Sequence, residues 1–186
     1  MKATSSDITL GVLGLGHVGL PTAIGLAELG WNVIGSDDYA EKADQIRGGV
    51  APFYEPGLVE LLRSNLDSGN FIVGRSVEET IEKSDAIFVC VGTPQNEDGS
   101  ADLSQIEAVG RVIAQNASSD LVVVEKSTTP VSTAKRLKDT MTRYARNNLN
   151  IDVAVNPEFL REGSGMKDFF NPDRIVLGVE SEAAKG

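Results

Sequence analysis

Short runs of apolar and β-branched residues alternate along the chain with longer stretches in which apolar positions recur every three or four residues. The short runs predict strands at Ile8–Leu13, Asn32–Ser36, Phe71–Val73, Ala86–Val91, Leu121–Glu125, Ile151–Val155 and Arg174–Val179. The longer stretches predict helices at Leu20–Leu29, Glu41–Arg47, Leu58–Leu66, Leu103–Asn116 and Ser132–Arg146. Strands that are apolar throughout and separated by helices are typical of a parallel sheet covered on both faces. We therefore expect an α/β fold of the doubly wound type.

Signals at the ends of these elements indicate one domain. Gly30 directly follows a predicted helix and is expected to end it, because glycine readily adopts the conformation that closes helices. Ser132 follows a proline and is expected to cap the helix that begins there. The last residues of the chain are small and polar. We expect a single domain over residues 1–180, followed by a terminal linker over residues 181–186.

Composition narrows the class of protein. Hydrophobic residues make up 41% of the 186 positions and charged residues 24%, as in ordinary folded proteins. The net charge of −10 argues against binding nucleic acid through its phosphates. No apolar run could span a membrane, and the first residues lack the apolar core of a secretory signal, so we expect a cytoplasmic protein without a membrane partner. A single cysteine, Cys90, and a single histidine, His17, give no basis for a disulfide or a metal site.

One glycine-rich segment matches the G-x-G-x-x-G pattern of dinucleotide-binding folds. It runs from Gly14 through Gly16 to Gly19, directly between the first predicted strand and the first predicted helix. In that context Gly14 permits a tight turn, Gly16 lets a diphosphate approach the backbone, and Gly19 lets the helix pack close to the sheet. The free N–H groups at the start of the helix attract the phosphates. We therefore expect a mostly parallel Rossmann-type sheet with helices on both faces; a plain glycine-rich turn is the alternative.

An acidic pair ends the second predicted strand. A carboxylate at Asp37 is placed to accept hydrogen bonds from the adenosine ribose hydroxyls, and it would repel a 2′-phosphate. The sequence thus predicts NAD rather than NADP as the cofactor. Asp38 leaves the assignment open, because strand alternation turns only one of two adjacent side chains toward a ligand.

Polar loops follow three further predicted strands. They are Val91–Pro94, Lys126–Pro130 and Asn156–Gly163. In a doubly wound sheet ligands bind at the carboxyl ends of the strands, so these loops should face the cofactor. A desolvated glutamate in the last loop could act as a general base. Ordinary turns carrying solvated charges are the alternative for each loop.

Together, these segments resemble the UDP-glucose/GDP-mannose dehydrogenase family. The shared motifs occur in the family's order over nearly the whole chain: GLGHVGLPTA (14–23), YEPGL (54–58), VGTP (91–94), KSTTP (126–130), NPEFLREG (156–163) and NPDRIV (171–176). The last motif is more similar to the UDP-glucose 6-dehydrogenase branch than to the GDP-mannose branch, which stays an alternative. Dehydrogenases of the 6-phosphogluconate and 3-hydroxyacyl types share only the glycine-rich fingerprint.

The resemblance implies an oxidoreductase. Family members oxidise the C6 alcohol of a nucleotide sugar to a carboxylate by two hydride transfers to NAD⁺, through a thioester on a cysteine. It implies UDP-glucose as the substrate of the complete enzyme, a place in polysaccharide biosynthesis, and pairing of two copies through a central helix.

The resemblance, together with the fingerprint, also implies roles for individual residues. Glu158 would be the general base or water activator, and Thr128 would position water and contact the cofactor. Cofactor contacts are expected at Gly14, Gly16, His17, Val18, Gly19, Asp37, Lys42, Gly92, Thr93, Pro94, Thr128 and Glu162. Substrate contacts are expected at Glu158, Phe159, Leu160, Arg161 and Glu162.

The chain also departs from the family pattern. His17 stands where the family usually has tyrosine, a change that could alter cofactor affinity; a tolerated loop residue is the alternative. The family's central helix, C-terminal UDP-binding domain and catalytic cysteine have no counterpart in the 186 residues, and Cys90 lies in a predicted apolar strand where burial makes a thiol inert. We therefore expect the chain alone to bind NAD(H) without oxidising the sugar. A stand-alone NAD(H)-sensing or regulatory module is the alternative.

Overall fold

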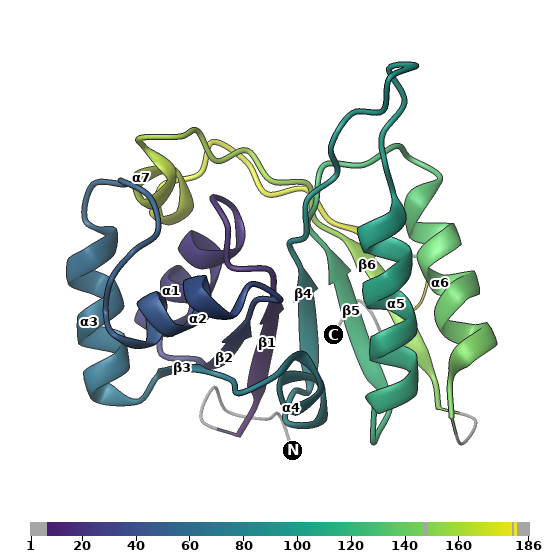
Figure 1. Cartoon of the computed structure of the whole chain (residues 1–186), viewed down its shortest axis with the longest axis horizontal. Helices are drawn as coiled ribbons and strands as arrows, with labels where there is room; N and C mark the ends of the chain where they lie inside the picture. The colour runs from purple at the N-terminus through teal and green to yellow at the C-terminus, as the bar shows by residue number, and fades with distance from the viewer. Residues whose placement is uncertain (1–6, 147–148, 180, 182–186) are drawn as a thin grey trace.

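A computed structural model describes residues 7–146, 149–179 and 181 of the protein. Its strands are β1 (Thr9–Leu13), β2 (Asn32–Ser36), β3 (Phe71–Val73), β4 (Ala86–Val89), β5 (Leu121–Glu125), β6 (Ile151–Val155) and β7 (Gly178–Val179). They form one sheet in the order β3-β2-β1-β4-β5-β6-β7 (Figure 1). The strands from β3 to β6 pair in parallel, and β7 joins the edge antiparallel to β6. The structure thus confirms the doubly wound, mostly parallel sheet.

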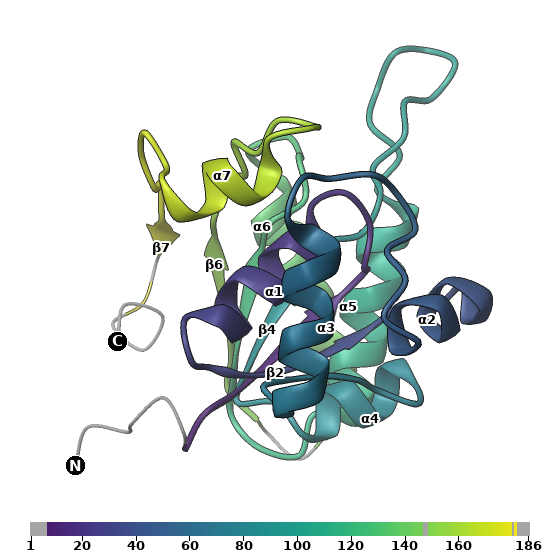
Figure 2. The same cartoon turned by 90° about the vertical axis from the view of Figure 1, so that its left-hand side faces the viewer.

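The helices form a layer on each face of this sheet. They are α1 (Gly19–Glu28), α2 (Ala40–Arg47), α3 (Leu58–Ser68), α4 (Val77–Glu82), α5 (Ser104–Asn116), α6 (Thr133–Tyr144) and α7 (Gly165–Phe170). One buried apolar cluster joins α1, α3 and α7, together with Ile46 of α2, to the sheet, and a second cluster joins α4, α5 and α6 to it. Figure 2 shows α1 and α7 on one side of the sheet and α4 and α5 on the other. Alternation along β1 serves both faces: Leu10 and Val12 belong to the first cluster, and Leu13 belongs to the second.

The carboxyl ends of the parallel strands meet at one edge of the sheet. At this edge the loop 90–103, between β4 and α5, projects away from the body of the protein in both views (Figures 1 and 2). An antiparallel bridge between Gln95 and Ala101 closes its base. The edge holds the loops that the sequence singled out, and ligands bind there in doubly wound sheets. Among the described helices, none is long and apolar enough to cross a membrane.

The predicted strands are all found, and most of them have the predicted bounds. β2, β3, β5 and β6 have the predicted bounds, whereas β4 ends at Val89 rather than Val91 because the chain turns out into the projecting loop. The strand predicted over Arg174–Val179 is wrong in its first part. Only Gly178 and Val179 find a partner strand, and the preceding residues cross the sheet edge with Ile175 and Leu177 exposed.

The predicted helices are all present, with bounds that differ by a few residues, and Gly30 follows α1 with a φ of 91° as expected. Two short helices, α4 and α7, were not predicted. α4 did carry a signal, because Ser76 accepts a hydrogen bond from the N–H of Glu79, as in a capping box. The capping role predicted for Ser132 is wrong, since its side chain makes no hydrogen bond to the start of α6. Most of the expected linker 181–186 lies outside the described residues.

Candidate functional site

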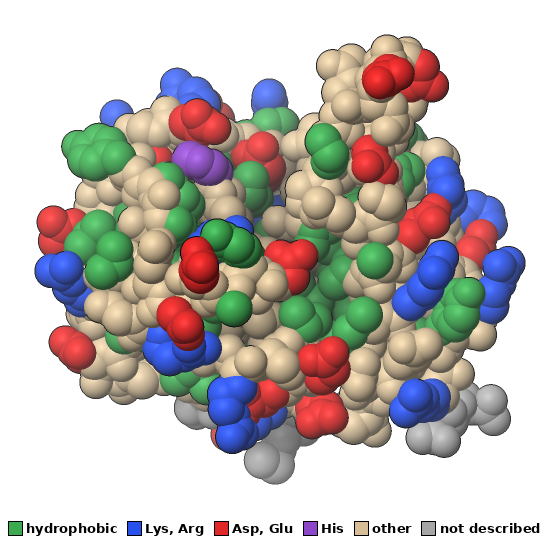
Figure 3. All heavy atoms as spheres, in the orientation of Figure 1, with side chains coloured by type: hydrophobic (Ala, Val, Ile, Leu, Met, Phe, Trp, Pro, Cys, Tyr) green, Lys and Arg blue, Asp and Glu red, His purple; other side chains and the backbone are tan. Residues whose placement is uncertain are grey.

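A cleft of about 510 Å³ opens at the carboxyl ends of β1, β2 and β4. Its walls come from the glycine-rich loop after β1, the end of β2, the start of α4, the loop after β4 and one face of α5. The surface there is hollowed, with apolar side chains in the hollow and acidic side chains beside it (Figure 3). Its volume lies in the range of pockets that hold small ligands and cofactors.

The glycines of the fingerprint explain why this cleft is open at the start of α1. Gly14 has a φ of 91°, and a Cβ added there would lie 2.6 Å from the carbonyl oxygen of Cys90. A Cβ at Gly19 would overlap the carbonyl oxygen of Gly14, so only glycine lets α1 begin this close to β1. A Cβ at Gly16, by contrast, would meet nothing within 4 Å. The residues therefore fit a diphosphate, because the N-terminus of α1 stays accessible beside Gly16.

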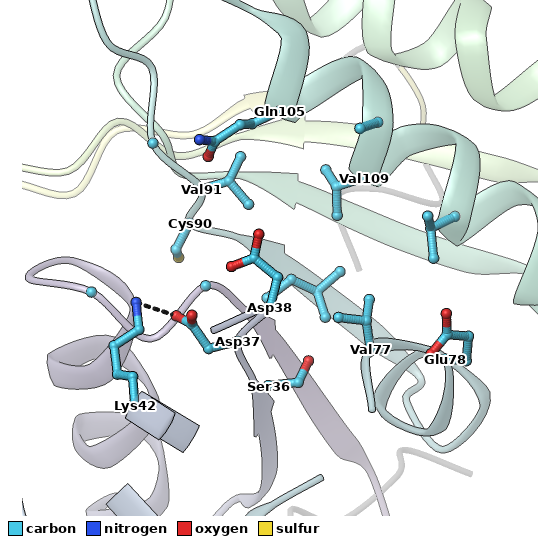
Figure 4. A pocket seen from close by; sticks show the side chains of 16 residues that line it. Ser36, Asp37, Asp38, Lys42, Val77, Glu78, Cys90, Val91, Gln105 and Val109 are labelled. Atoms are coloured by element: carbon cyan, nitrogen blue, oxygen red, sulfur yellow. Dashed lines mark ion pairs between the residues drawn. The ribbon is translucent and has the colours of Figure 1, made fainter. Parts of the chain in front are cut away.

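Asp37 holds the fingerprint loop to the end of β2. Its Oδ2 accepts a hydrogen bond from the N–H of Leu15 at 2.8 Å, and its Oδ1 accepts one from the N–H of Tyr39 at 3.0 Å. Nζ of Lys42 lies 2.6 Å from the same Oδ2 (Figure 4). The Asp37 side chain is only 3% exposed and that of Lys42 is 26% exposed, so the two predicted cofactor residues form one partly buried ion pair at the cleft wall.

An apolar wall faces this ion pair across the cleft. Gln105, Ala108, Val109 and Val112 lie along one side of α5, and Val77 adds to the apolar lining from the start of α4. Such a surface suits a flat purine ring. These α5 positions are spaced three or four residues apart, so they share one side of the helix that the sequence predicted over Leu103–Asn116.

Hydrogen bonds join the loops after β4 and β5. Oγ1 of Thr93 donates to the carbonyl of Thr128 at 2.8 Å, and Oγ of Ser127 donates to the carbonyl of Val91 at 2.8 Å. Oγ1 of Thr129 donates to Glu125 at 2.8 Å. The side chain of Thr128 is exposed and makes no hydrogen bond within the described part of the chain. Of the hydroxyls in this loop, that of Thr128 is therefore the one available to a ligand.

Buried ionisable groups lie just below these loops. Nζ of Lys126 donates to Oδ1 of Asn156 at 3.0 Å, and burial lowers the pKa of Lys126. Burial raises the pKa of the Cys90 thiol to about 12 and that of Glu125 above its ordinary value. Cys90 lies one residue beyond β4 with its side chain toward the cleft (Figure 4), and its burial disfavours the thiolate, which is the form of cysteine that reacts.

The loop after β6 is held by bonds from its own side chains and from distant ones. Oε2 of Glu158 accepts the N–H of Leu160 at 2.7 Å, and the guanidinium of Arg161 makes an ion pair with Asp168 at 2.7 Å. The N–H of Gly163 donates to Oε2 of Glu55 at 2.9 Å. Phe159 and Glu162 are exposed, with Arg174 stacked over the Phe159 ring at 4.8 Å.

The structure thus divides the predicted site residues into groups. Those that line the cleft are Gly14, Gly16, Asp37, Lys42 and Gly92. Gly19 and Val18 lie beneath it at the start of α1, and His17 is exposed and stacks on Phe53 with ring centres 4.0 Å apart. The others do not line this cleft and lie in the loops after β4, β5 and β6: Thr93, Pro94, Thr128, Glu158, Phe159, Leu160, Arg161 and Glu162. The sequence did not single out the cleft positions on α4 and α5.

Comparison with known proteins agrees with this geometry. Residues 8–186 match the model of the NAD-binding domain of the UDP-glucose/GDP-mannose dehydrogenase family. The UDP-glucose 6-dehydrogenase YwqF of Bacillus subtilis is 44% identical over 171 residues, which cover 92% of this chain and 39% of that protein. The chain therefore spans about two fifths of the length of such relatives.

Solved structures give the same result. A UDP-glucose dehydrogenase from Pyrobaculum islandicum superposes with a TM-score of 0.94 at 41% identity, over 100% of this chain and 44% of that one. A GDP-mannose dehydrogenase from Pseudomonas aeruginosa superposes with a TM-score of 0.90 at 32% identity, over 95% of this chain and 42% of that one. The chain belongs to the UDP-glucose/GDP-mannose dehydrogenase family of NAD-dependent oxidoreductases, and it corresponds to their NAD-binding domain.

Proposed function

We propose that this chain supplies the cofactor half of an enzyme that oxidises UDP-glucose to UDP-glucuronate by two hydride transfers to NAD⁺. The observation that carries the proposal is the open space beside Gly16 at the start of α1, next to the buried carboxylate of Asp37. UDP-glucose is favoured over GDP-mannose because the UDP-glucose enzymes above are 41–44% identical and the GDP-mannose enzyme is 32% identical. We expect the complete enzyme to act in the cytoplasm as a pair of subunits.

The cofactor, when bound, supplies the hydride acceptor, and the residues of this chain hold it. The backbone N–H groups after Gly16 bind the diphosphate, since no side chain blocks the start of α1. Asp37 keeps the glycine-rich loop closed through the N–H of Leu15 and offers its remaining lone pairs to the adenosine ribose. The apolar face of α5 excludes water from the purine side of the cleft.

Two residues outside the cleft are proposed to act in the chemistry. The free, exposed hydroxyl of Thr128 can donate to a water molecule or to the cofactor, because Thr93 fixes the backbone of Thr128. Glu158 uses one carboxylate oxygen to accept the N–H of Leu160 and keeps the other for a water proton. These roles require a substrate held by other parts of the complete enzyme.

Calorimetric titration of residues 1–186 with NAD⁺ tests the binding claim. We expect measurable heat, and we expect Gly16→Val to weaken binding at least about tenfold by placing a side chain where the diphosphate approaches. The Gly16→Val variant should keep the fold, because a Cβ there contacts nothing within 4 Å. Absence of heat at millimolar NAD⁺ with a folded chain would contradict the proposal.

A second measurement separates binding from turnover. Residues 1–186 mixed with NAD⁺ and UDP-glucose should form no NADH, because the chain spans only 39% of a relative's length and cannot position the sugar alone. Steady formation of NADH by the purified chain would show that the cofactor half is catalytically sufficient, which the proposal denies.

A further inference from the structure

The two adjacent acids at the end of β2 have different surroundings. The carboxylate of Asp37 accepts two backbone hydrogen bonds and pairs with Lys42, and its side chain is 3% exposed. Its charge is therefore compensated inside the protein, and its main effect is to hold the fingerprint loop. Asp37 by itself presents little uncompensated negative charge to an incoming anion.

Asp38 is the opposite case. It is exposed and makes no hydrogen bond or ion pair within the described residues. Figure 4 shows its carboxylate turned into the cleft, whereas Asp37 turns toward Lys42. Strand alternation alone did not decide which of the two acids faces the ligand. In the structure, Asp38 carries the uncompensated negative charge at this wall of the cleft.

A second hollow, of about 380 Å³, adjoins the cleft and shares Asp37 and Asp38 with it. Two arginines line it, which is unusual for a pocket that must reject phosphate. Both are already paired: Arg47 with Asp44 and with the carbonyl of Gly74, and Arg75 with Glu79. Because the charges of both arginines are compensated, the unpaired carboxylate of Asp38 sets the sign of the net charge around this hollow.

We propose that Asp38 determines cofactor specificity by excluding dinucleotides that carry a 2′-phosphate, while Asp37 positions the fingerprint loop. This inference rests on the proposed NAD-binding function. The second hollow lies next to the acid that marks the adenosine ribose, so a 2′-phosphate would enter beside Asp38. A phosphate dianion close to a free carboxylate is repelled, and the repulsion between exposed charges weakens with salt.

The test compares NAD⁺ with NADP⁺ by calorimetric titration at low salt. Asp38→Asn should raise the affinity for NADP⁺ relative to NAD⁺ at least about tenfold, which is about 1.4 kcal/mol. Asp67→Asn is the matched control, because it removes the same charge from an exposed position on α3 outside both hollows. The gain in the Asp38 variant should shrink as salt is raised.

Two smaller ligands test whether the change in affinity arises at the 2′-phosphate itself. Adenosine 2′,5′-bisphosphate should gain affinity in the Asp38→Asn variant relative to AMP, by a factor similar to that for NADP⁺, because the nicotinamide half is absent from both probes. The inference would be overturned, with NAD⁺ binding intact, if the NADP⁺-to-NAD⁺ affinity ratio of Asp38→Asn stayed within twofold of that of the unchanged chain. It would also be overturned if Asp67→Asn changed this ratio as much as Asp38→Asn does. Failure of the unchanged chain to bind NAD⁺ would overturn both the inference and the proposed function.

Discussion

The fingerprint loop on one side of the cleft and the loops after β5 and β6 on the other side are held in place by different kinds of interaction. Around the fingerprint, backbone sterics at Gly14 and Gly19 and the ion pair of Asp37 with Lys42 fix the loop within a short stretch of chain and one neighbouring strand. The loops after β5 and β6 depend instead on single hydrogen bonds between residues far apart, such as Glu55 with Gly163. The cofactor side is therefore determined locally, and the other side needs the assembled fold.

The largest predicted loss of stability comes from disrupting the fingerprint loop at the start of α1. Gly19→Ala should cost roughly 3 kcal/mol or more in free energy of unfolding, because the new Cβ would overlap the backbone carbonyl of Gly14 and neither can move freely. Chemical unfolding followed by circular dichroism measures this loss. Gly16→Ala is the control, since its Cβ contacts nothing within 4 Å and should leave stability nearly unchanged. Equal stability of the two variants would show that the close start of α1 is not a steric requirement.

The same difference explains how much could be predicted from the sequence. The fingerprint, the sheet and the position of Asp37 follow from patterns that are local in the chain, and the structure confirms their placement. The pairing of Glu55 with Gly163 was not predicted, because nothing in the residue pattern fixes which distant groups meet. The ion pair of Arg161 with Asp168 is close in the chain, but it lies where no regular element was predicted, so its geometry could not be predicted either. Helix α7 was missed for a similar reason: it is short and its starting serine makes no capping hydrogen bond.

The link between the two sides can be broken at Glu55. Its Oε2 accepts the N–H of Gly163, and its side chain is 6% exposed. Glu55→Ala should lower the free energy of unfolding by about 1–2 kcal/mol and speed amide hydrogen exchange around Gly163, because that N–H loses its partner. NAD⁺ affinity should change little. Glu60→Ala, an exposed glutamate on α3, is the control, and unchanged exchange around Gly163 in Glu55→Ala would contradict the link.

A smaller change in the free energy of unfolding, this time a gain, is expected from a substitution beneath the loop after β5. Glu125 is 1% exposed, accepts one hydrogen bond from Thr129, and has a pKa raised by burial. The folded state therefore binds its proton more tightly than the unfolded state, so this group's contribution to stability is full below pH 4.5 and is lost as pH rises through the folded pKa. Glu125→Gln should keep the bond to Thr129 and gain about 1 kcal/mol at neutral pH.

Urea unfolding of this variant across pH checks the sign. The gain of Glu125→Gln over the unchanged chain should vanish near or below pH 4.5, where both carry a neutral group. Glu82→Gln, at an exposed position of α4, should show no such pH-dependent gain. A gain of the same size at all pH values would mean that packing, not charge burial, separates the two side chains.

The smallest effect is local to the loop after β6. The carboxylate of Asp168 accepts hydrogen bonds from the backbone and guanidinium of Arg161 and from Ser164, and the guanidinium holds its pKa below the usual range. Because this acid is favoured as an anion in the folded state, the contacts are present above its ordinary pKa and are lost as pH falls toward the lowered one. Asp168→Asn should raise amide exchange across residues 161–168 severalfold without moving the unfolding midpoint. Asp139→Asn, which removes an exposed helix pair with Lys135, should leave that exchange unchanged. A drop in the midpoint with Asp168→Asn would show that this loop helps to stabilise the whole fold, so the two sides of the cleft edge would differ less than their contacts indicate.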